Sequence, residues 1–294
     1  MTTESDALPP PSKQDKAEKR MPFMAHLDEL RVSLRRAAIA YMFGCILAGV
    51  FSEELYVILL RPLLIAAQKA DMKLTLNFMS PVEPFWVYFK VAMIFGLFVS
   101  APAIFWQLWK FIGPGLYRRE KRIVAPFTFF SAIFFIGGAL FCQLVVMPIA
   151  YQFFLGYSKQ HLGAWTTLFG HRINFQYAPE VAINPVLMME PVLAFAMKML
   201  IAFGLVFELP LVLAFLASIG IVSARALWRF NKYAIIICFI VGGVLTPGPD
   251  VMSQCLMSIP LWLLYNMSIV IAWMVGRNKK KASEQNVGEG GEQA

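Results

Sequence analysis

Long runs of apolar residues recur along the chain and are separated by shorter polar stretches. A helix that crosses the roughly 30 Å hydrocarbon core of a bilayer needs about 20 residues, because each adds about 1.5 Å. The pattern therefore predicts an all-α membrane protein. Its six expected membrane-spanning helices are residues 32–52, 84–106, 126–147, 191–216, 233–245 and 251–275.

Two of these helices are expected to be irregular. The fifth run has only 14 residues between Lys232 and Pro247, which is about 21 Å of helix and shorter than the bilayer core. Pro260 lies in the sixth run and is expected to kink or unwind its outer part, because proline has no N–H to donate. The last two helices should therefore form a short hairpin.

Composition indicates a membrane protein, and the distribution of charge indicates on which side of the membrane its termini lie. Of the 294 residues, 59% are hydrophobic and 15% charged, whereas soluble domains carry about 25% charged residues. The cytoplasmic loops of membrane proteins are rich in Lys and Arg. Here 19 of the 26 Lys and Arg lie in residues 1–36, 107–125, 218–232 and 276–294, and 5 lie in the opposite loops. Both termini are therefore expected in the cytoplasm, as disordered tails (1–20 and 277–294) around a six-helix domain (21–276).

Acidic residues stand within two of the basic stretches. Glu29 follows Asp28 just before the first expected span, and Glu120 lies among basic residues between the second and third. Carboxylates can bind guanidinium groups bidentately, so the two could act together on arginine ligands. The residues alone equally allow solvated acidic groups in a membrane anchor, and they do not show that the two carboxylates meet.

Polar residues inside the expected spans are a second group of candidates. Glu208 lies near the middle of the fourth span, where an ionisable group costs several kcal/mol and is a functional candidate. Pro210 leaves a backbone carbonyl there without its usual donor. Gln254 follows the last outer turn and could hydrogen-bond a polar group of another helix. Lys90 and Lys198 lie near span ends and are expected to extend toward the headgroups.

Signs of an enzyme are missing from the sequence. His26, His161 and His171 lie outside the expected spans, no Asp lies within one, and no HExxH, GxSxG or P-loop motif occurs. The four cysteines lie apart in apolar segments, as buried hydrophobic residues do. We expect no enzymatic activity, no metal and no cofactor. A proton-coupled small-solute secondary transporter that uses Glu208 is the alternative function.

Several motifs, taken in order from Met24 to Gly276, resemble those of the C subunit of the twin-arginine protein translocase, the TatC family. They include His26-Leu27-Asp28-Glu29-Leu30-Arg31, Phe111-Ile112-Gly113-Pro114-Gly115-Leu116-Tyr117, Glu120-Lys121-Arg122, Phe207-Glu208-Leu209-Pro210 and Leu245-Thr246-Pro247.

This resemblance implies six helices in a concave, glove-like arrangement, with both termini cytoplasmic and the last two helices short. It implies a place in the bacterial plasma (inner) membrane and no enzymatic step. The implied function is to bind signal peptides with two consecutive arginines on folded cargo. TatB-like and TatA-like single-span subunits would then assemble with the chain into a multimeric complex driven by the proton-motive force.

The resemblance also assigns residues to these roles. It places signal-peptide binding at Glu29, Arg31, Phe111, Arg118 and Glu120, and intramembrane partner contacts at Glu208 and Gln254. Two departures carry no family role: the outer loop at residues 155–189 is longer than is common in the family, and an extra residue in the last outer turn leaves the role of Asp250 open.

Overall fold

The structure is mainly helical, and the membrane spans expected from the sequence are helices. The computed structural model describes residues 23–112, 124–158, 165–168, 171–174, 186–246 and 251–291. Within these ranges, six segments are long and apolar enough to cross a membrane: Leu27–Val50, Glu83–Ile112, Ala125–Gly156, Met189–Ser218, Ala224–Leu245 and Gln254–Met274. The prediction of an all-α membrane protein with six candidate spans is confirmed.

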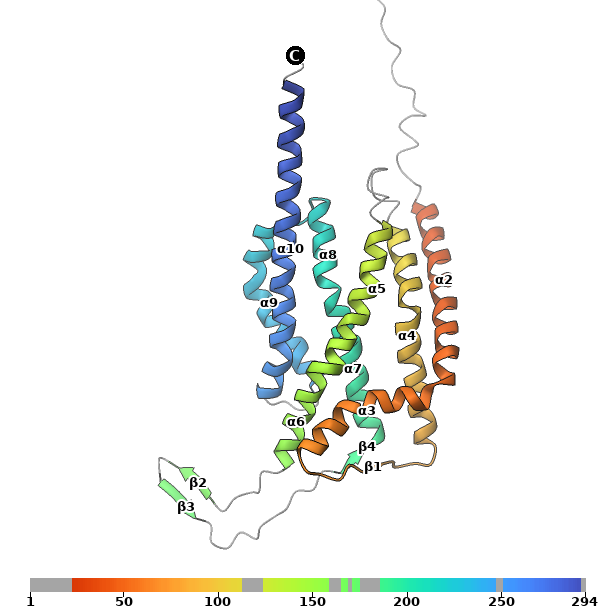
Figure 1. Ribbon diagram of the computed structural model, residues 1–294, viewed down its shortest axis with the longest axis vertical. Helices are drawn as coiled ribbons and strands as arrows, with labels where there is room; N and C mark the ends of the chain where they lie inside the picture. The colour runs from red at the N-terminus through yellow and green to blue at the C-terminus, as the bar shows by residue number, and fades with distance from the viewer. Residues whose placement is uncertain are drawn as a thin grey trace, which may run out of the picture.

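The spanning helices stand side by side (Figure 1). Helix α2 (Phe23–Val50) packs against α4 (Glu83–Ile112), which packs against α5 (Val124–Phe141). Helices α7 (Met189–Phe207) and α8 (Leu209–Ser218) follow, and α9 (Ala224–Leu245) packs with α10 (Val251–Gly291). We call the end where α2 begins and α4 and α8 end the tail end, and the opposite end the loop end.

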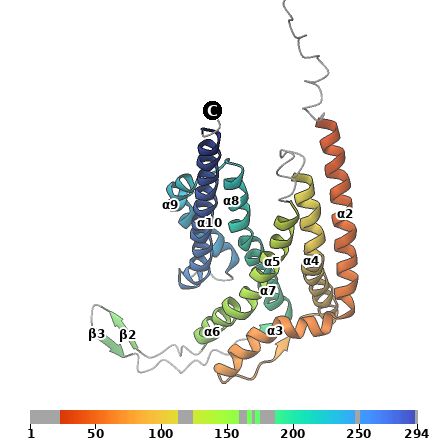
Figure 2. The same cartoon turned by 45° about the horizontal axis from the view of Figure 1, so that its top comes forward.

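A further helix, α3 (Ser52–Lys69), lies across the loop end of the bundle (Figure 2). Beside it, the third span passes through a π-helical turn, η3 (Cys142–Val146), into α6 (Met147–Ser158), so this span is longer than expected. Pro62 lies inside α3 and cannot donate to the carbonyl of Ile58 one turn earlier. Instead, Nε2 of Gln143 in η3 donates to Ile58 O at 2.7 Å. The π turn thus places an amide where the proline left an acceptor without a donor.

We expect Gln143→Leu to lower the free energy of unfolding by about 1 kcal/mol, the usual worth of one hydrogen bond. In a Pro62→Ala background the loss should shrink, because the new N–H can donate to Ile58. Thermal unfolding of the four variants in detergent measures this coupling. Gln68→Leu, on the exposed face of α3, is the matched control. Equal losses in both backgrounds would contradict the contact.

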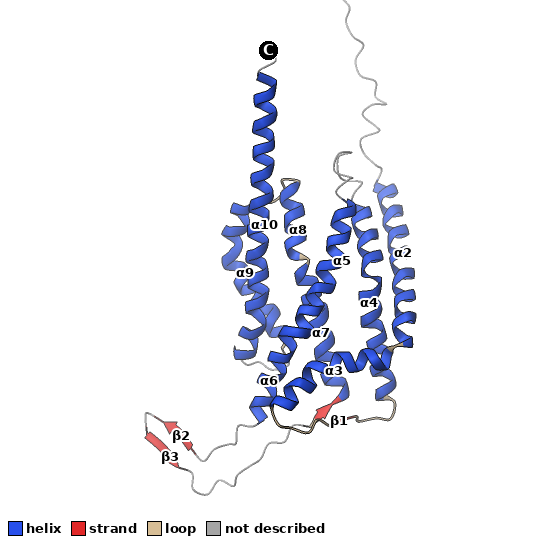
Figure 3. Ribbon diagram, viewed as in Figure 1, coloured by secondary structure: helices blue, strands red, loops and turns tan. Residues whose placement is uncertain are grey.

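Two small β-pairs lie in the connections at the loop end. Strand β1 (Leu76–Asn77) pairs in parallel with β4 (Leu187–Met188). This pairing joins the connection between α3 and α4 to the start of α7. Strands β2 (Trp165–Leu168) and β3 (His171–Asn174) form an antiparallel hairpin within the long connection between α6 and α7 (Figure 3).

The fifth helix is longer than predicted. The expected 14-residue span is a helix of 22 residues, α9, because Ser223 caps its start by accepting the N–H of Ala226 at 3.2 Å. The basic residues that suggested a loop, Arg225, Arg229 and Lys232, lie within this helix. With 22 and 21 residues, the last two candidate spans are still the shortest of the six.

The sixth helix also differs from the prediction. Pro260 lies inside α10, which is continuous from Val251 to Gly291, so the outer part is not unwound. The helix also continues through residues 277–291, where a disordered tail was expected, and this stretch contains the strong helix formers Lys, Ala, Glu and Gln. The expected N-terminal tail, residues 1–20, lies outside the described residues.

Candidate functional site

Glu29 and Phe111 lie at the same level of the tail end. Helices α2 and α4 run in opposite directions (Figure 1) and come so close that a Cβ on Gly44 would lie 2.5 Å from the carbonyl oxygen of Gly96. Equal numbers of residues, counted from this crossing toward the tail end, lead to Glu29 on α2 and Phe111 on α4. Both helices rise by about 1.5 Å per residue, so these two residues lie at about the same height along the bundle.

The other residues expected to bind a signal peptide are less completely placed. Glu29 and Phe111 are half-buried, whereas Arg31 is exposed on α2. Arg118 and Glu120 belong to residues 113–123 and lie outside the described residues. Their connection starts directly after the last turn of α4 and ends at α5, and both of these helix ends are at the tail end (Figure 1).

Glu208 lies where the fourth span breaks into two helices. It ends α7 and precedes α8, and Pro210 takes a position in the first turn of α8, where a missing N–H costs little. From the sequence, Pro210 was expected to leave a carbonyl without its donor, and the break between the two helices is a further feature that the structure shows. The side chain of Glu208 is only 8% exposed, and its Oε1 has no hydrogen-bond partner within the described residues.

A buried polar contact connects the neighbourhood of Glu208 to the end of α4. The hydroxyl of Ser131 on α5, fully buried, is a polar neighbour of the Glu208 carboxyl. The same hydroxyl accepts the indole N–H of Trp109 at 2.8 Å. Trp109 is 4% exposed and packs edge-on against Phe215 of α8, with 4.8 Å between ring centroids.

Sequence reasoning missed Trp109 as part of this site. Trp106, three residues earlier on α4, is 47% exposed, as aromatic residues at a membrane boundary often are. Trp109 is instead buried two residues before Phe111, so it joins the α4 end at the tail face to the intramembrane carboxyl. A hydrogen bond between residues 22 positions apart leaves no local signal in the sequence.

Gln254 fastens the last two helices together. Its Nε2 donates to the carbonyl of Phe239 on α9 at 2.7 Å. Gly242 and Gly243 allow this approach: a Cβ on Gly243 would lie 3.0 Å from Nε2 of Gln254. This hydrogen bond lies within the chain, between α10 and α9, and the contact of Gln254 with a partner helix stays a prediction.

Comparison with known proteins decides the family. Residues 25–260 match the family model described as Sec-independent protein translocase protein (TatC). The chain belongs to the TatC family. A TatC protein of Desulforapulum autotrophicum is 40% identical over 268 residues, which cover 91% of this chain and 90% of the relative. One of Aquifex aeolicus is 35% identical over 89% of this chain and 98% of its own. A crystal structure of the twin-arginine translocase receptor TatC superposes with a TM-score of 0.70 at 34% identity, over 84% of this chain and 99% of that one.

Membership of the TatC family settles the class of function. The chain is a twin-arginine translocase receptor subunit that acts in protein export. It is a multi-pass membrane protein that transports proteins and is not an enzyme. The alternative of a small-solute transporter is therefore set aside. Within the described residues no group of His, Cys, Asp and Glu side chains is arranged to hold a metal ion.

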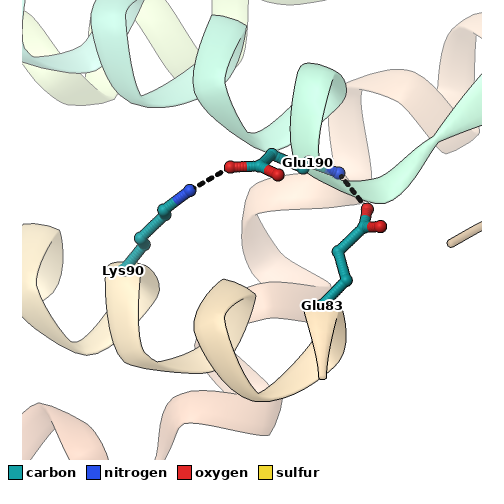
Figure 4. Close-up of polar contacts among 3 residues, drawn as sticks. All are labelled: Glu83, Lys90 and Glu190. Carbon is teal, nitrogen blue, oxygen red and sulfur yellow. Dashed lines mark hydrogen bonds and ion pairs between the residues drawn. The ribbon is translucent and has the colours of Figure 1, made fainter. Parts of the chain in front are cut away.

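At the loop end of this TatC chain, three charged residues join α4 to the start of α7 (Figure 4). Lys90 forms an ion pair with Glu190, and the backbone N–H of Glu190 donates to Oε1 of Glu83 at 3.1 Å. The other carboxylate oxygen of Glu83 accepts the N–H of Met79 at 2.7 Å. Lys90, which was expected only to extend toward the headgroups, thus helps to hold the connections at the loop end in place.

Proposed function

We propose that the tail end of the bundle binds the two consecutive arginines of a signal peptide through Glu29 and Glu120. The observation that carries the proposal is the packing of α2 on α4, which brings Glu29 to the same height as Phe111 at the end of α4. The chain continues from there into the connection that contains Arg118 and Glu120. Phe111, Arg31 and Arg118 would complete the site around the two carboxylates.

The chemistry of the two carboxylates favours arginine over lysine. A guanidinium group offers two parallel N–H donors to one carboxylate, whereas an ammonium group is a point charge that cannot form this paired contact. Hydrogen bonds to charged groups contribute about 1.5 to 3 kcal/mol each. Two such contacts therefore give both affinity and selectivity for consecutive arginines.

This function places the tail end in the cytoplasm of a bacterium. The excess of Lys and Arg in the stretches at this end supports that orientation. Both termini would then lie on the cytoplasmic side of the plasma (inner) membrane. In this orientation, signal peptides meet Glu29 before export begins. We further propose that the six helices form the concave, glove-like arrangement of the family.

Single-span TatB-like and TatA-like subunits are the proposed partners inside the membrane. The Oε1 atom of Glu208 is buried and has no hydrogen-bond partner in the described part of the chain, so it suits a polar group brought by a partner helix. Gln254 would add a second polar contact through its amide oxygen. The resulting multimeric complex would use the proton-motive force to move folded cargo.

Selectivity for arginine tests this proposal. We expect a signal peptide with two arginines to bind the chain in lipid nanodiscs roughly tenfold more tightly than the same peptide with two lysines, because bidentate contacts are lost. Fluorescence anisotropy of labelled peptides measures the difference. Glu208→Gln, far from the tail face, should leave the ratio unchanged. Equal affinity for both peptides would refute the assignment of carboxylates to arginines.

A further inference from the structure

A groove between α9 and α10 lies at the tail end, apart from Glu29 and Glu208. It has a volume of about 760 Å³. Its walls combine two arginines with large apolar side chains: Arg225, Trp228, Arg229, Ile269, Val270 and Trp273. The arginines are exposed, and so are the two indole rings, at 67% for Trp228 and 52% for Trp273.

The groove lies at the boundary between hydrocarbon and water. The fifth candidate span starts at Ala224 and the sixth ends at Met274, so the groove is made of the first turns of one span and the last turns of the other. Tryptophan is enriched at this depth because its ring is apolar and its N–H is polar. Long arginine side chains at span ends reach the headgroups from such positions.

Within the described residues, the positive charge of the groove has no counter-charge. Arg225 and Arg229 are four residues apart and share one face of α9. Within the described part of the chain neither forms an ion pair, and the sequence has no Asp or Glu from Ala224 to Leu245 or from Val251 to Ser283. An occupant with an anionic group at this level would neutralise both guanidinium groups.

Hydrogen bonds between the two helices keep the groove in shape. The hydroxyl of Tyr265 donates to the carbonyl of Leu227 at 2.9 Å in the interior. The indole N–H of Trp262 donates to Asn231 at 3.0 Å, and the amide of Asn231 donates to Asn266 at 3.2 Å. Because these contacts already fix α9 on α10, an occupant does not have to order the walls when it binds.

We propose that this groove binds one anionic phospholipid of the leaflet at the tail end. Its phosphate pairs with Arg225 and Arg229, since guanidinium groups bind phosphate bidentately. An acyl chain lies against Ile269, Val270 and the indole rings. Basic pockets between membrane helices hold anionic headgroups in this way. A purely apolar partner helix suits the groove poorly, because it would cover two arginines without neutralising them.

Native mass spectrometry of the full chain in mild detergent, titrated with phosphatidylglycerol or phosphatidylcholine, tests the proposal. We expect tighter binding of phosphatidylglycerol, and a loss of roughly tenfold in its affinity in the Arg225→Gln/Arg229→Gln variant. The Arg225→Lys/Arg229→Lys variant should bind more phosphatidylglycerol than the Gln variant, because it keeps both charges. The control variant, Arg35→Gln/Arg36→Gln, removes the same charge from exposed positions on α2.

A second measurement locates the lipid in the groove. In vesicles of phosphatidylcholine with phosphatidylglycerol brominated on its acyl chains, tryptophan fluorescence should be quenched more in the native chain than in the Arg225→Gln/Arg229→Gln variant. The difference should disappear when Trp228 and Trp273 are both replaced by Phe. Equal loss of lipid in the groove and control variants would overturn the site, and so would a single-span partner helix in the groove of the purified complex with no phospholipid retained.

Discussion

Replacing Glu29 and Glu120 together with alanine should abolish photo-crosslinking of the chain to a twin-arginine signal peptide. Each carboxylate is expected to supply about 1.5 to 3 kcal/mol to the bound arginines, so the double replacement should weaken binding by about a hundredfold or more. A crosslinker placed beside the arginines of the peptide measures the loss directly. The single replacements should each retain part of the binding, because one carboxylate remains.

Two controls separate a binding defect from a general change of charge or fold. Asp28→Ala removes the same charge from the neighbouring, exposed position on α2 and should leave crosslinking nearly unchanged. Glu208→Ala alters a buried carboxyl remote from the tail face and should also keep most of the signal binding. Unchanged crosslinking in the Glu29→Ala/Glu120→Ala variant would refute the assignment of the site.

The sequence predicted the spans and the buried glutamate because both leave a local mark. A run of about 20 apolar residues has few structural outcomes besides a membrane helix, and a carboxylate within such a run stands out. Pro210 was expected to leave a carbonyl without its donor, and the structure breaks the span just before it, at Glu208. These features depend on neighbours within one or two turns.

The sequence failed where charge patterns and distant contacts decide the structure. Arg225, Arg229 and Lys232 suggested a loop, yet they extend α9 because long basic side chains at a helix end reach water from within the helix. The partners of Trp109 and Gln143 lie 22 and 85 residues away. The π turn that aims Gln143 at α3 has no simple sequence signal either. Such contacts appear only once the helices are packed.

Glu208→Ala should lower export of a twin-arginine reporter by roughly tenfold, whereas Glu208→Gln should keep most of it. Removing a buried polar partner costs about 1 to 3 kcal/mol. With alanine at this position, the polar group of the partner helix would have no acceptor. Glutamine keeps a carbonyl oxygen and avoids the cost of burying a charge. Export in cells and copurification of the single-span subunits measure the effect.

The hydrogen bond between Trp109 and Ser131 makes this prediction more specific. Trp109→Phe keeps an aromatic ring against Phe215 but removes the donor to the hydroxyl beside Glu208. If this hydrogen bond holds the Glu208 carboxyl in the position that a partner helix needs, Trp109→Phe should reduce export. Binding of the signal peptide at the tail face should persist. Glu54→Ala, an exposed carboxylate on α3, should change neither. Equal export by Glu208→Ala and Glu208→Gln would remove the polar contact from the mechanism and leave Glu208 as a packing residue at a helix break.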